Sequence, residues 1–366
     1  MEAPVCALRN IGFSFIHAFS CDVDPHVRAT IRANYSPRGE IYEDITKRDS
    51  CNLSSDIYVA GFPCQPFSVQ GMHQGFEDSR GRGRIFSFVR KYIHQNRPRL
   101  FLLENVKGLV SVNGGRNFQR IMRSLRLIGV YNLYHRILNT KDHGVPQNRE
   151  RLYIVGIRID VDRGTFSFPD PITCPSIECF LDVRVRNLAM TGAPPEKQTT
   201  ASRNLKHCIC ELTRRGVHPD KEPWVVDVDS SFDRVVSMKA LSPCITARRC
   251  DGHWVTNRGR RLLKTEMLRL QGMSPLGFRV AVPERELGKQ LGNTMSVNVL
   301  ERVFARALPA AGFVGRYEVV DRWQNGQALV SLMKTRGYTL EILPVDAPER
   351  ACNYERKKRG WAEWLA

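Results

Sequence analysis

Short apolar runs alternate with longer amphipathic stretches from about residue 11 to residue 160 of the chain. They predict strands at residues 15–20, 57–60, 100–103 and 151–157, and helices at residues 26–35, 85–95 and 118–128. This alternation is typical of a parallel sheet covered by helices. Each predicted strand ends in a polar cluster, and ligands of such sheets bind at the carboxyl ends of the strands.

The pattern changes after residue 163. Residues 164–257 contain prolines, short β-like pieces and scattered basic residues, which indicate a smaller, irregular domain. Helical character returns at residues 264–271 and 294–307, so we expect residues 258–311 to rejoin the first domain, residues 1–163. Residues 312–366 contain strand-like pieces at 317–320, 328–332 and 338–343, and form an appendage of unknown role.

Composition narrows the class of protein. With 42% hydrophobic and 25% charged residues, the chain has an ordinary globular composition. No apolar run could span a bilayer and no secretion signal is present, so we expect no membrane association and interpret the 11 cysteines as thiols. The net charge of +18 favours a polyanionic partner, although a merely basic soluble protein is the alternative.

Cys64 follows the predicted strand at residues 57–60, within the segment Gly-Phe-Pro-Cys-Gln-Pro at residues 61–66. The glycine and the two prolines fix an unusual backbone course and hold the thiol at the carboxyl edge of the sheet. A lone cysteine is usually a small buried hydrophobe, but a buried cysteine needs no such setting. We therefore interpret Cys64 as a nucleophile.

Two further polar clusters adjoin predicted strands. Glu104 directly follows the apolar run at residues 100–103, where it could be a helix cap or a general acid. Alternation in the segment Gln-Asn-Arg-Glu-Arg at residues 147–151 puts Gln147, Arg149 and Arg151 on one face. Guanidinium groups there can hold a carbonyl or a carboxylate, and a solvated charge run is the alternative.

In this order the clusters resemble motifs of the cytosine-C5 DNA methyltransferase family. The similar segments are its nucleophile motif (61–68), the segment after its mobile loop (75–81), Glu-Asn-Val (104–106), Gln-x-Arg-x-Arg (147–151) and its last two motifs (268–272, 290–294). Six motifs in family order identify the chain as a member. The resemblance implies an α/β fold, with a Rossmann-like methyltransferase sheet in the catalytic and cofactor-binding domain and a target-recognition domain at residues 164–257.

The family mechanism assigns roles to the reactive residues. By resemblance, Cys64 adds to C6 of cytosine, Glu104 contacts or protonates N3, Arg151 holds O2, and Arg149 supports the nucleophile loop or the same oxygen. C5 then takes a methyl group from S-adenosyl-L-methionine. The cytosine must leave the duplex to react, and the segment at residues 69–84 is expected to close over it.

The resemblance also places the cofactor. An acidic residue after the second strand of such a sheet commonly binds ribose hydroxyls, and Asp22 matches that position, with Val23 beside the adenine. Asp24 is the alternative, since either residue could simply cap the next helix. Further cofactor contacts are expected from Asp44, Ile45, Asn293 and Thr294. No metal site is expected.

One feature departs from the family pattern. The family opens with a strand and an aromatic-x-Gly-x-Gly loop, whereas residues 1–4 of this chain pass directly into a predicted helix at residues 5–10. We expect the first strand and most of the glycine loop to be missing, through an incomplete gene model or a degenerate homologue. Because that strand is central in the family sheet, its absence should uncover the neighbouring strand edges.

Double-stranded DNA is the expected partner, and protein partners are unknown. The segment at residues 241–249 resembles the end of the family's target-recognition domain, where side chains approach the flipped base, and its arginines could read guanine edges or only phosphates. The expected DNA contacts are Gln65, Ser68, Arg80, Arg82, Thr246 and Arg248.

Two alternatives to a DNA methyltransferase stay open. Related tRNA methyltransferases usually carry Pro-Pro-Cys, whereas Phe62-Pro63-Cys64 is DNA-like. A catalytically impaired DNA-binding homologue is the second alternative, because of the missing glycine loop. The expected location is the nucleus in a eukaryotic host and the cytoplasm in a bacterial one.

Overall fold

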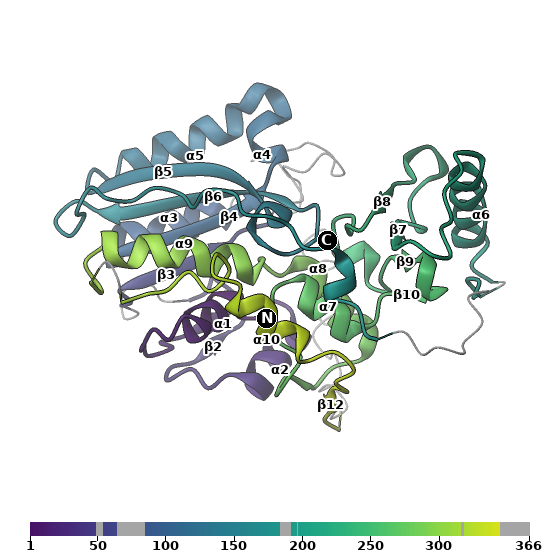
Figure 1. Cartoon of the computed structure of the whole chain (residues 1–366). Coiled ribbons are helices and arrows are strands. Elements are labelled where there is room, and N and C mark those ends of the chain that lie inside the picture. The colour runs from purple at the N-terminus through teal and green to yellow at the C-terminus, as the bar shows by residue number, and fades with distance from the viewer. Residues whose placement is uncertain (49–53, 64–84, 184–191, 196, 316–317, 345–366) are drawn as a thin grey trace, which may run out of the picture.

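The computed structural model describes residues 1–48, 54–63, 85–183, 192–195, 197–315 and 318–344. Its largest sheet has four strands in the order β3-β4-β6-β5 (Figure 1). They are β3 (Ile57–Gly61), β4 (Leu100–Val106), β5 (Tyr131–Asn139) and β6 (Glu150–Arg158). The predictions of β3, β4 and β6 are confirmed, whereas β5 was not predicted, since its polar residues interrupt the apolar run.

The sheet is mixed, and the expectation of a purely parallel sheet is wrong. β3 and β4 are parallel, but β6 is antiparallel to both β4 and β5. Only residues 140–149 connect β5 to β6. That connection is shorter than the dozen or so residues that a crossover between parallel strands needs, so the chain turns back as a hairpin.

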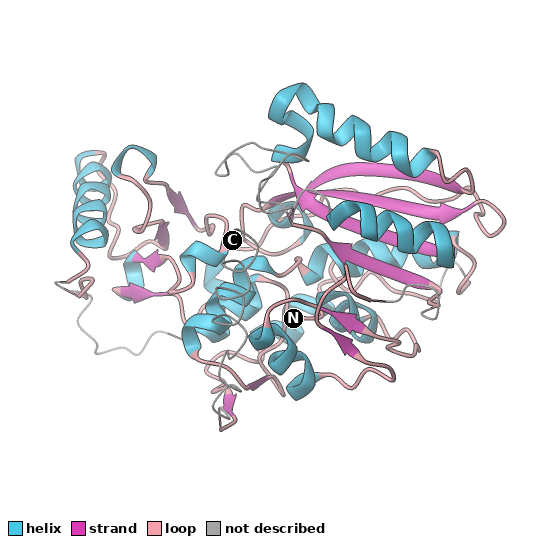
Figure 2. Ribbon diagram, turned by 180° about the vertical axis from the view of Figure 1, so that it is seen from behind, coloured by secondary structure: helices cyan, strands magenta, loops and turns pink. Residues whose placement is uncertain are grey.

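Helices cover both faces of this sheet (Figures 1 and 2). On one face, α3 (Ile85–Asn96) and α5 (Arg116–Arg126) pack against Phe101 and Leu103. On the other face, Leu100 and Leu102 belong to the core that includes α9 (Val297–Ala310). Burial on both sides explains the uninterrupted apolar run of β4. A short helix, α4 (Gly108–Ser111), joins the carboxyl end of β4 to α5.

A second, two-stranded parallel sheet lies apart from the first. It consists of β1 (Ser20–Cys21) and β2 (Ile41–Tyr42), flanked by α1 (Ala3–Asn10) and α2 (Pro25–Asn34). Of the strand predicted at residues 15–20, only Ser20 lies in a strand. Among the described strands, β1 pairs only with β2 and β3 only with β4.

The region predicted as a target-recognition domain contains a small sheet in the order β10-β9-β7-β8. Its strands are β7 (Trp224–Val226), β8 (Ser237–Lys239), β9 (Trp254–Val255) and β10 (Arg260–Arg261), and α6 (Thr199–Arg214) packs on it (Figure 2). Helix α6 was not predicted. Ala201, Leu205, Cys208 and Leu212 follow helical spacing and are buried, but Cys208 was counted as a thiol rather than as a core residue.

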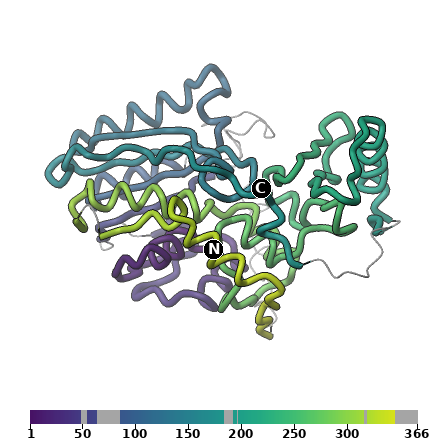
Figure 3. The backbone as a smooth tube through the Cα atoms, in the orientation of Figure 1, coloured from purple at the N-terminus to yellow at the C-terminus, as the bar shows by residue number. Residues whose placement is uncertain are grey.

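The remaining helices and strands all come from residues 264–342, the green to yellow part of the trace in Figure 3. They are α7 (Lys264–Leu270), α8 (Glu284–Asn293), α10 (Gln327–Met333), β11 (Arg279–Val280) and β12 (Glu341–Ile342). The strand predicted at residues 328–332 is wrong, because Ala328 and Leu332, one helical turn apart, both enter the main core from α10. Residues 318–320 form no strand, and only β12 matches the piece at 338–343. No helix of the described segments has the length and apolar character to cross a membrane.

Candidate active site

Glu104 and Arg151 meet where β4 ends and β6 begins. Nε of Arg151 lies 3.2 Å from Oε1 of Glu104, and the two side chains are 14% and 12% exposed. Burial raises the pKa of Glu104, and the charges of Arg151 and Arg149 offset part of this rise. Oε1 of Glu104 accepts no hydrogen bond from any described residue. The pair therefore combines a carboxyl group that holds its proton more readily than usual with a fixed positive charge.

Arg149 is fully buried beside this pair and binds main-chain carbonyl groups. Its Nη1 donates to the oxygens of Ile245 at 2.8 Å and Gly292 at 3.1 Å, and its Nη2 donates to the oxygen of Thr294 at 2.7 Å. These bonds join β6 to the end of the target-recognition region and to the end of α8. The geometry favours a positioning role for Arg149, which tethers the chain around the pair.

Gln147 makes a second tether that was not among the predicted site residues. It is fully buried, its Nε2 donates to the oxygen of Leu270 at 2.7 Å, and its Oε1 accepts from the main-chain N–H of Ile245 at 3.0 Å. The sequence signal that could have identified Gln147 was its place in the motif at residues 147–151. Because both side-chain groups of Gln147 are used, it fixes the same loop as Arg149.

Cys244 is a thiol beside the pair that the sequence analysis did not assign. Its Sγ lies 3.7 Å from Nη1 of Arg149 and 3.7 Å from Nη2 of Arg151. Its position in the segment at residues 241–249 was the only sequence signal. The contact brings the end of the target-recognition region directly to the Glu104–Arg151 pair.

Asn105 connects β4 to the segment that leads toward Cys64. Its buried Nδ2 donates to the main-chain oxygen of Phe62 at 3.2 Å, and Gly61 is the register partner of Glu104. A Cβ added to Gly61 would lie 3.0 Å from Cε of Met295, so this strand end is closely packed. Of the predicted site residues, Cys64, Gln65, Ser68, Arg80 and Arg82 lie outside the described residues.

Thr246 and Arg248 lie where the target-recognition region meets α8. Thr246 precedes a short 3₁₀ helix, Ala247–Arg249, and Arg248 is exposed. A Cβ on Gly292 of α8 would lie 2.1 Å from the main-chain carbon of Thr246. Glycine is therefore required at this crossing, because any side chain would push the two backbones apart.

The predicted cofactor residues follow the strands of the smaller sheet. Asp22 comes after β1, where Oδ1 accepts the N–H of Asp24 at 2.9 Å and burial raises its pKa. Val23 is 77% exposed, and Asp44, after β2, accepts from the N–H and the hydroxyl of Thr46. Ile45 packs against the core beneath α3 and α5. The capping role left open between Asp22 and Asp24 falls to Asp24, which accepts the N–H of His26 in α2.

Thr294 lies at the end of α8, next to Asn293. Its carbonyl accepts from Arg149, while its hydroxyl is buried and has no hydrogen-bond partner among the described residues. The structure therefore brings Thr294 to the Arg149 tether and leaves its hydroxyl available to a ligand.

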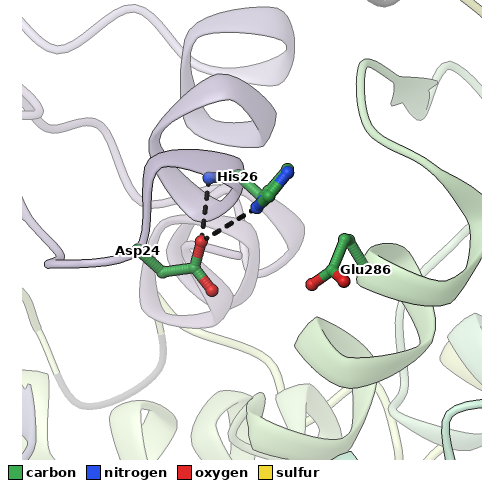
Figure 4. Close-up of side chains that lie close together, drawn as sticks. All are labelled: Asp24, His26 and Glu286. Carbon is green, nitrogen blue, oxygen red and sulfur yellow. Dashed lines mark hydrogen bonds and ion pairs between the residues drawn. The ribbon is translucent and has the colours of Figure 1, made fainter. Parts of the chain in front are cut away.

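Asp24, His26 and Glu286 form a three-residue cluster between α2 and α8 (Figure 4). Their potential ligand atoms lie within 4.8 Å of one another. Asp24 already caps α2, and Glu286 forms an ion pair with Lys289 at 2.6 Å. Since both carboxylates have protein partners, these contacts explain the cluster without a bound metal.

Comparison with known proteins shows the family of the chain. A model of the family described as C-5 cytosine-specific DNA methylase matches residues 5–308. The type II methyltransferase M.HpaII of Haemophilus parainfluenzae is 40% identical over 321 residues, covering 84% of this chain and 86% of that protein. M.NgoBI of Neisseria gonorrhoeae is 34% identical over 287 residues, covering 78% of this chain and 84% of that protein.

Solved structures show the same fold. The Entamoeba histolytica methyltransferase EhMeth matches with a TM-score of 0.59 at 16% identity, covering 84% of this chain and 94% of that one. S. pombe Dnmt2 matches with a TM-score of 0.56 at 17% identity, covering 85% and 96%. The sequence and structure together place this chain in the C-5 cytosine-specific DNA methylase family, as a DNA (cytosine-5-)-methyltransferase.

Proposed function

We propose that this chain methylates C5 of cytosine in double-stranded DNA with S-adenosylmethionine as the donor, and that Cys64, Glu104 and Arg151 act on the base. The observation that carries the proposal is the buried Glu104–Arg151 pair, with an oxygen of Glu104 that no described residue hydrogen-bonds. That oxygen, Oε1, lies 3.2 Å from Nε of Arg151 but accepts no hydrogen bond from a described residue, so a ligand that donates a hydrogen bond to it gains affinity. Protonated N3 or the amino group of cytosine is such a donor.

The residue types fit addition to C6 followed by substitution at C5. The Cys64 thiolate forms a bond to C6, and the electron pair of the C5–C6 double bond moves through the ring toward N3. Glu104 places a proton on N3, which its raised pKa favours, and Arg151 stabilises the negative charge on O2. C5 then takes the methyl group and loses its proton to solvent. Breakage of the C6–sulfur bond releases the Cys64 thiolate, N3 returns its proton to Glu104, and the aromatic ring is restored.

The depth of the pair requires the base to leave the helix. With side chains only 12–14% exposed, Glu104 and Arg151 cannot touch a cytosine that stays stacked in a duplex. Flipping the nucleotide out exposes N3 and O2 to both side chains. Arg149 and Gln147 both hold the main chain of Ile245 beside the pair, so we assign them positioning roles.

S-adenosylmethionine supplies an electrophilic methyl group when it is bound. Residues on the smaller sheet fit its adenosine part: Asp22 and Asp44 follow the carboxyl ends of β1 and β2, where ribose and adenine bind in such sheets. The buried, unpartnered hydroxyl of Thr294 fits a polar group of the same molecule. We assign Asn293, Val23 and Ile45 to the same pocket from the family motifs.

Transfer of tritiated methyl groups tests the proposed function. The chain is incubated with tritiated S-adenosylmethionine and either unmethylated duplex DNA or tRNA, with Cys64→Ala as the matched control. We expect label in duplex DNA and none with the variant. Label in tRNA alone would reject DNA as the substrate, and salt-sensitive DNA binding without any transfer would favour a catalytically impaired homologue.

A further inference from the structure

The outer surface of the α3–α5 layer carries an unusual excess of positive charge. Helices α3 and α5 contain six Lys and Arg and no acidic residue, and the single acidic residue of residues 85–139 is Glu104 in β4. The whole chain has 55 basic and 37 acidic residues, so this excess is local rather than average. Glu104 lies in the active site and does not neutralise the outer surface.

Four arginines of α5 form the centre of this surface. Ile121, Met122 and Leu125 of the helix are buried against the sheet, whereas Arg116, Arg120, Arg123 and Arg126 are exposed. Their spacing of three and four residues places them along one side of the helix, and we call them the arginine row. At about 1.5 Å per residue, the row extends over roughly 15 Å.

The row lacks the acidic partners that usually accompany such spacing. In the described part of the chain, none of the four guanidinium groups forms an ion pair, whereas nearby Lys107 pairs with Glu150. Arg116 donates to the main-chain oxygen of Asn113, a contact that leaves its charge in place. Like charges at this spacing repel and weaken a helix, so a row without counter-charges favours an external anion.

The position of the arginine row relative to the active site indicates which anion it binds. β4 ends at Val106 beside the Glu104–Arg151 pair, and α4 connects that end to Arg116 at the start of α5. The helix then runs away from the active-site edge along the sheet (Figure 1). Only residues 107–115 separate the end of β4 from Arg116, so the arginine row begins close in the chain to the edge that carries the pair.

We propose that the arginine row binds the phosphate backbone of duplex DNA beyond the cytosine being methylated; this inference rests on the proposed function. Guanidinium groups pair with phosphate oxygens and release the ions condensed on DNA, which makes such binding strongly salt-dependent. No base-edge contact is required, so the row adds affinity for long DNA without adding sequence preference.

Binding to duplexes of two lengths tests the row. One duplex has about 12 base pairs, roughly one helical turn that fills only the active-site edge, and the other has about 40. The double variant Arg120→Gln/Arg123→Gln is compared with the matched variant Arg32→Gln/Arg38→Gln, which removes two exposed arginines near the smaller sheet. Fluorescence anisotropy is followed across a salt series, and thermal melting checks that each variant is folded.

We expect the row variant to lose about tenfold or more in affinity for the long duplex at low salt. The slope of log affinity against log salt should fall by roughly 0.9 for each phosphate contact removed. Affinity for the short duplex, methyl transfer to it and the behaviour of the matched variant should stay as in the wild type. Arg120→Lys/Arg123→Lys, which keeps both charges, should retain most of the slope.

Three outcomes would overturn the inference. Equal losses on both duplexes would make the row part of the primary site, and equal losses in the matched variant would reflect net charge alone. Unchanged DNA binding with lost affinity for polyglutamate would assign the row to an acidic protein. Failure of the proposed function is distinguishable, because it would abolish methyl transfer to the short duplex in the wild type.

Discussion

Glu104 and Arg151, expected at the reacting base, and Asp22 and Asp44, expected at the methyl donor, adjoin different sheets. Glu104 and Arg151 belong to the four-stranded sheet, are nearly buried and are surrounded by tethered chain. Asp22 and Asp44 follow the two-stranded sheet, and Val23 between them is 77% exposed. The residues around Glu104 and Arg151, the base-binding half of the site, are therefore buried and tethered. The residues around Asp22 and Asp44, the donor half, are partly exposed.

Strands β3 and β4 of the four-stranded sheet also differ from each other in packing. They are parallel neighbours with similar apolar sequences, yet Leu100–Leu103 of β4 are all buried, while Ile57, Val59 and Ala60 of β3 are only half-buried. β4 has a partner on each side, whereas β3 pairs with β4 alone among the described strands. Pairing on both edges, rather than hydrophobicity, therefore accounts for the deeper burial of β4.

The largest expected effect concerns the pair itself. Arg151→Met or Glu104→Gln should slow single-turnover methyl transfer roughly 10³-fold, because general-acid and charge stabilisation at the base are lost. Glu150→Gln removes an exposed neighbour that pairs with Lys107 and is the control. A loss of less than tenfold for the pair variants, at saturating DNA and donor, would show that the base-binding half is not where the reaction is controlled.

Arg149→Met should lower the free energy of unfolding by about 3–4 kcal/mol, because three buried carbonyl groups lose a charged donor. Urea denaturation measures the change. Arg158→Met, which breaks the largely exposed pair with Asp160, is the control and should cost about 1 kcal/mol or less. If both variants lose the same free energy of unfolding, the buried hydrogen bonds of Arg149 do not stabilise the base-binding half more than an exposed ion pair does.

Glu301 joins α9 to α1, which flanks the smaller sheet. It accepts from Asn10 at 2.6 Å, and burial raises its pKa to about 7. In the unfolded chain the group titrates near 4.5, so the folded protein binds the extra proton between pH 4.5 and 7 and loses stability as pH rises through that range. Glu301→Gln should therefore stabilise the protein by about 2–3 kcal/mol more at pH 8 than at pH 5.

Thermal melting at both pH values measures this difference. Glu284→Gln replaces a carboxylate that is 80% exposed and serves as the control, with little change expected between the two pH values. If Glu301→Gln stabilises the protein equally at pH 5 and pH 8, ionisation of Glu301 does not weaken the contact between α9 and α1.

The smallest effect is expected at the donor half. Asp22→Asn should weaken binding of S-adenosylmethionine by about tenfold or less, since one hydrogen-bonded charge on a partly exposed edge is lost. Calorimetric titration measures this change. Asp24→Asn alters the cap of α2 and should lower the melting temperature without changing donor affinity. Loss of affinity in Asp24→Asn but not in Asp22→Asn would reverse the two assignments.

The sequence predicted elements well where burial is two-sided. β4 has an apolar run long enough to be read directly, and Glu104 at its end could be placed on the carboxyl edge. β5 and α6 were not predicted, because their outer faces are polar. In α6, Cys208 also occupies a core position that an aliphatic residue usually fills. The antiparallel course of β6 depends on hairpin length, which strand periodicity does not encode.

Tertiary contacts determine the rest of the site. The motif at residues 147–151 predicted that its arginines face one way, but only the structure distinguishes Arg151, at the carboxylate, from Arg149, which binds carbonyl groups far away in sequence. Cys244 lies beside both because the target-recognition region folds back onto α8 at Gly292. No local pattern could reveal these pairings.

Release of tritium from DNA carrying [5-³H]cytosine, measured without any methyl donor, tests the central claim most directly. Addition of Cys64 to C6 makes C5 basic enough to take a proton from solvent, and elimination then expels tritium. If the base-binding half is organised independently of the donor half, the wild type should release tritium, and Cys64→Ala and Arg151→Met should not. Release that begins only when S-adenosylmethionine is added, or that persists in Arg151→Met, would contradict the account.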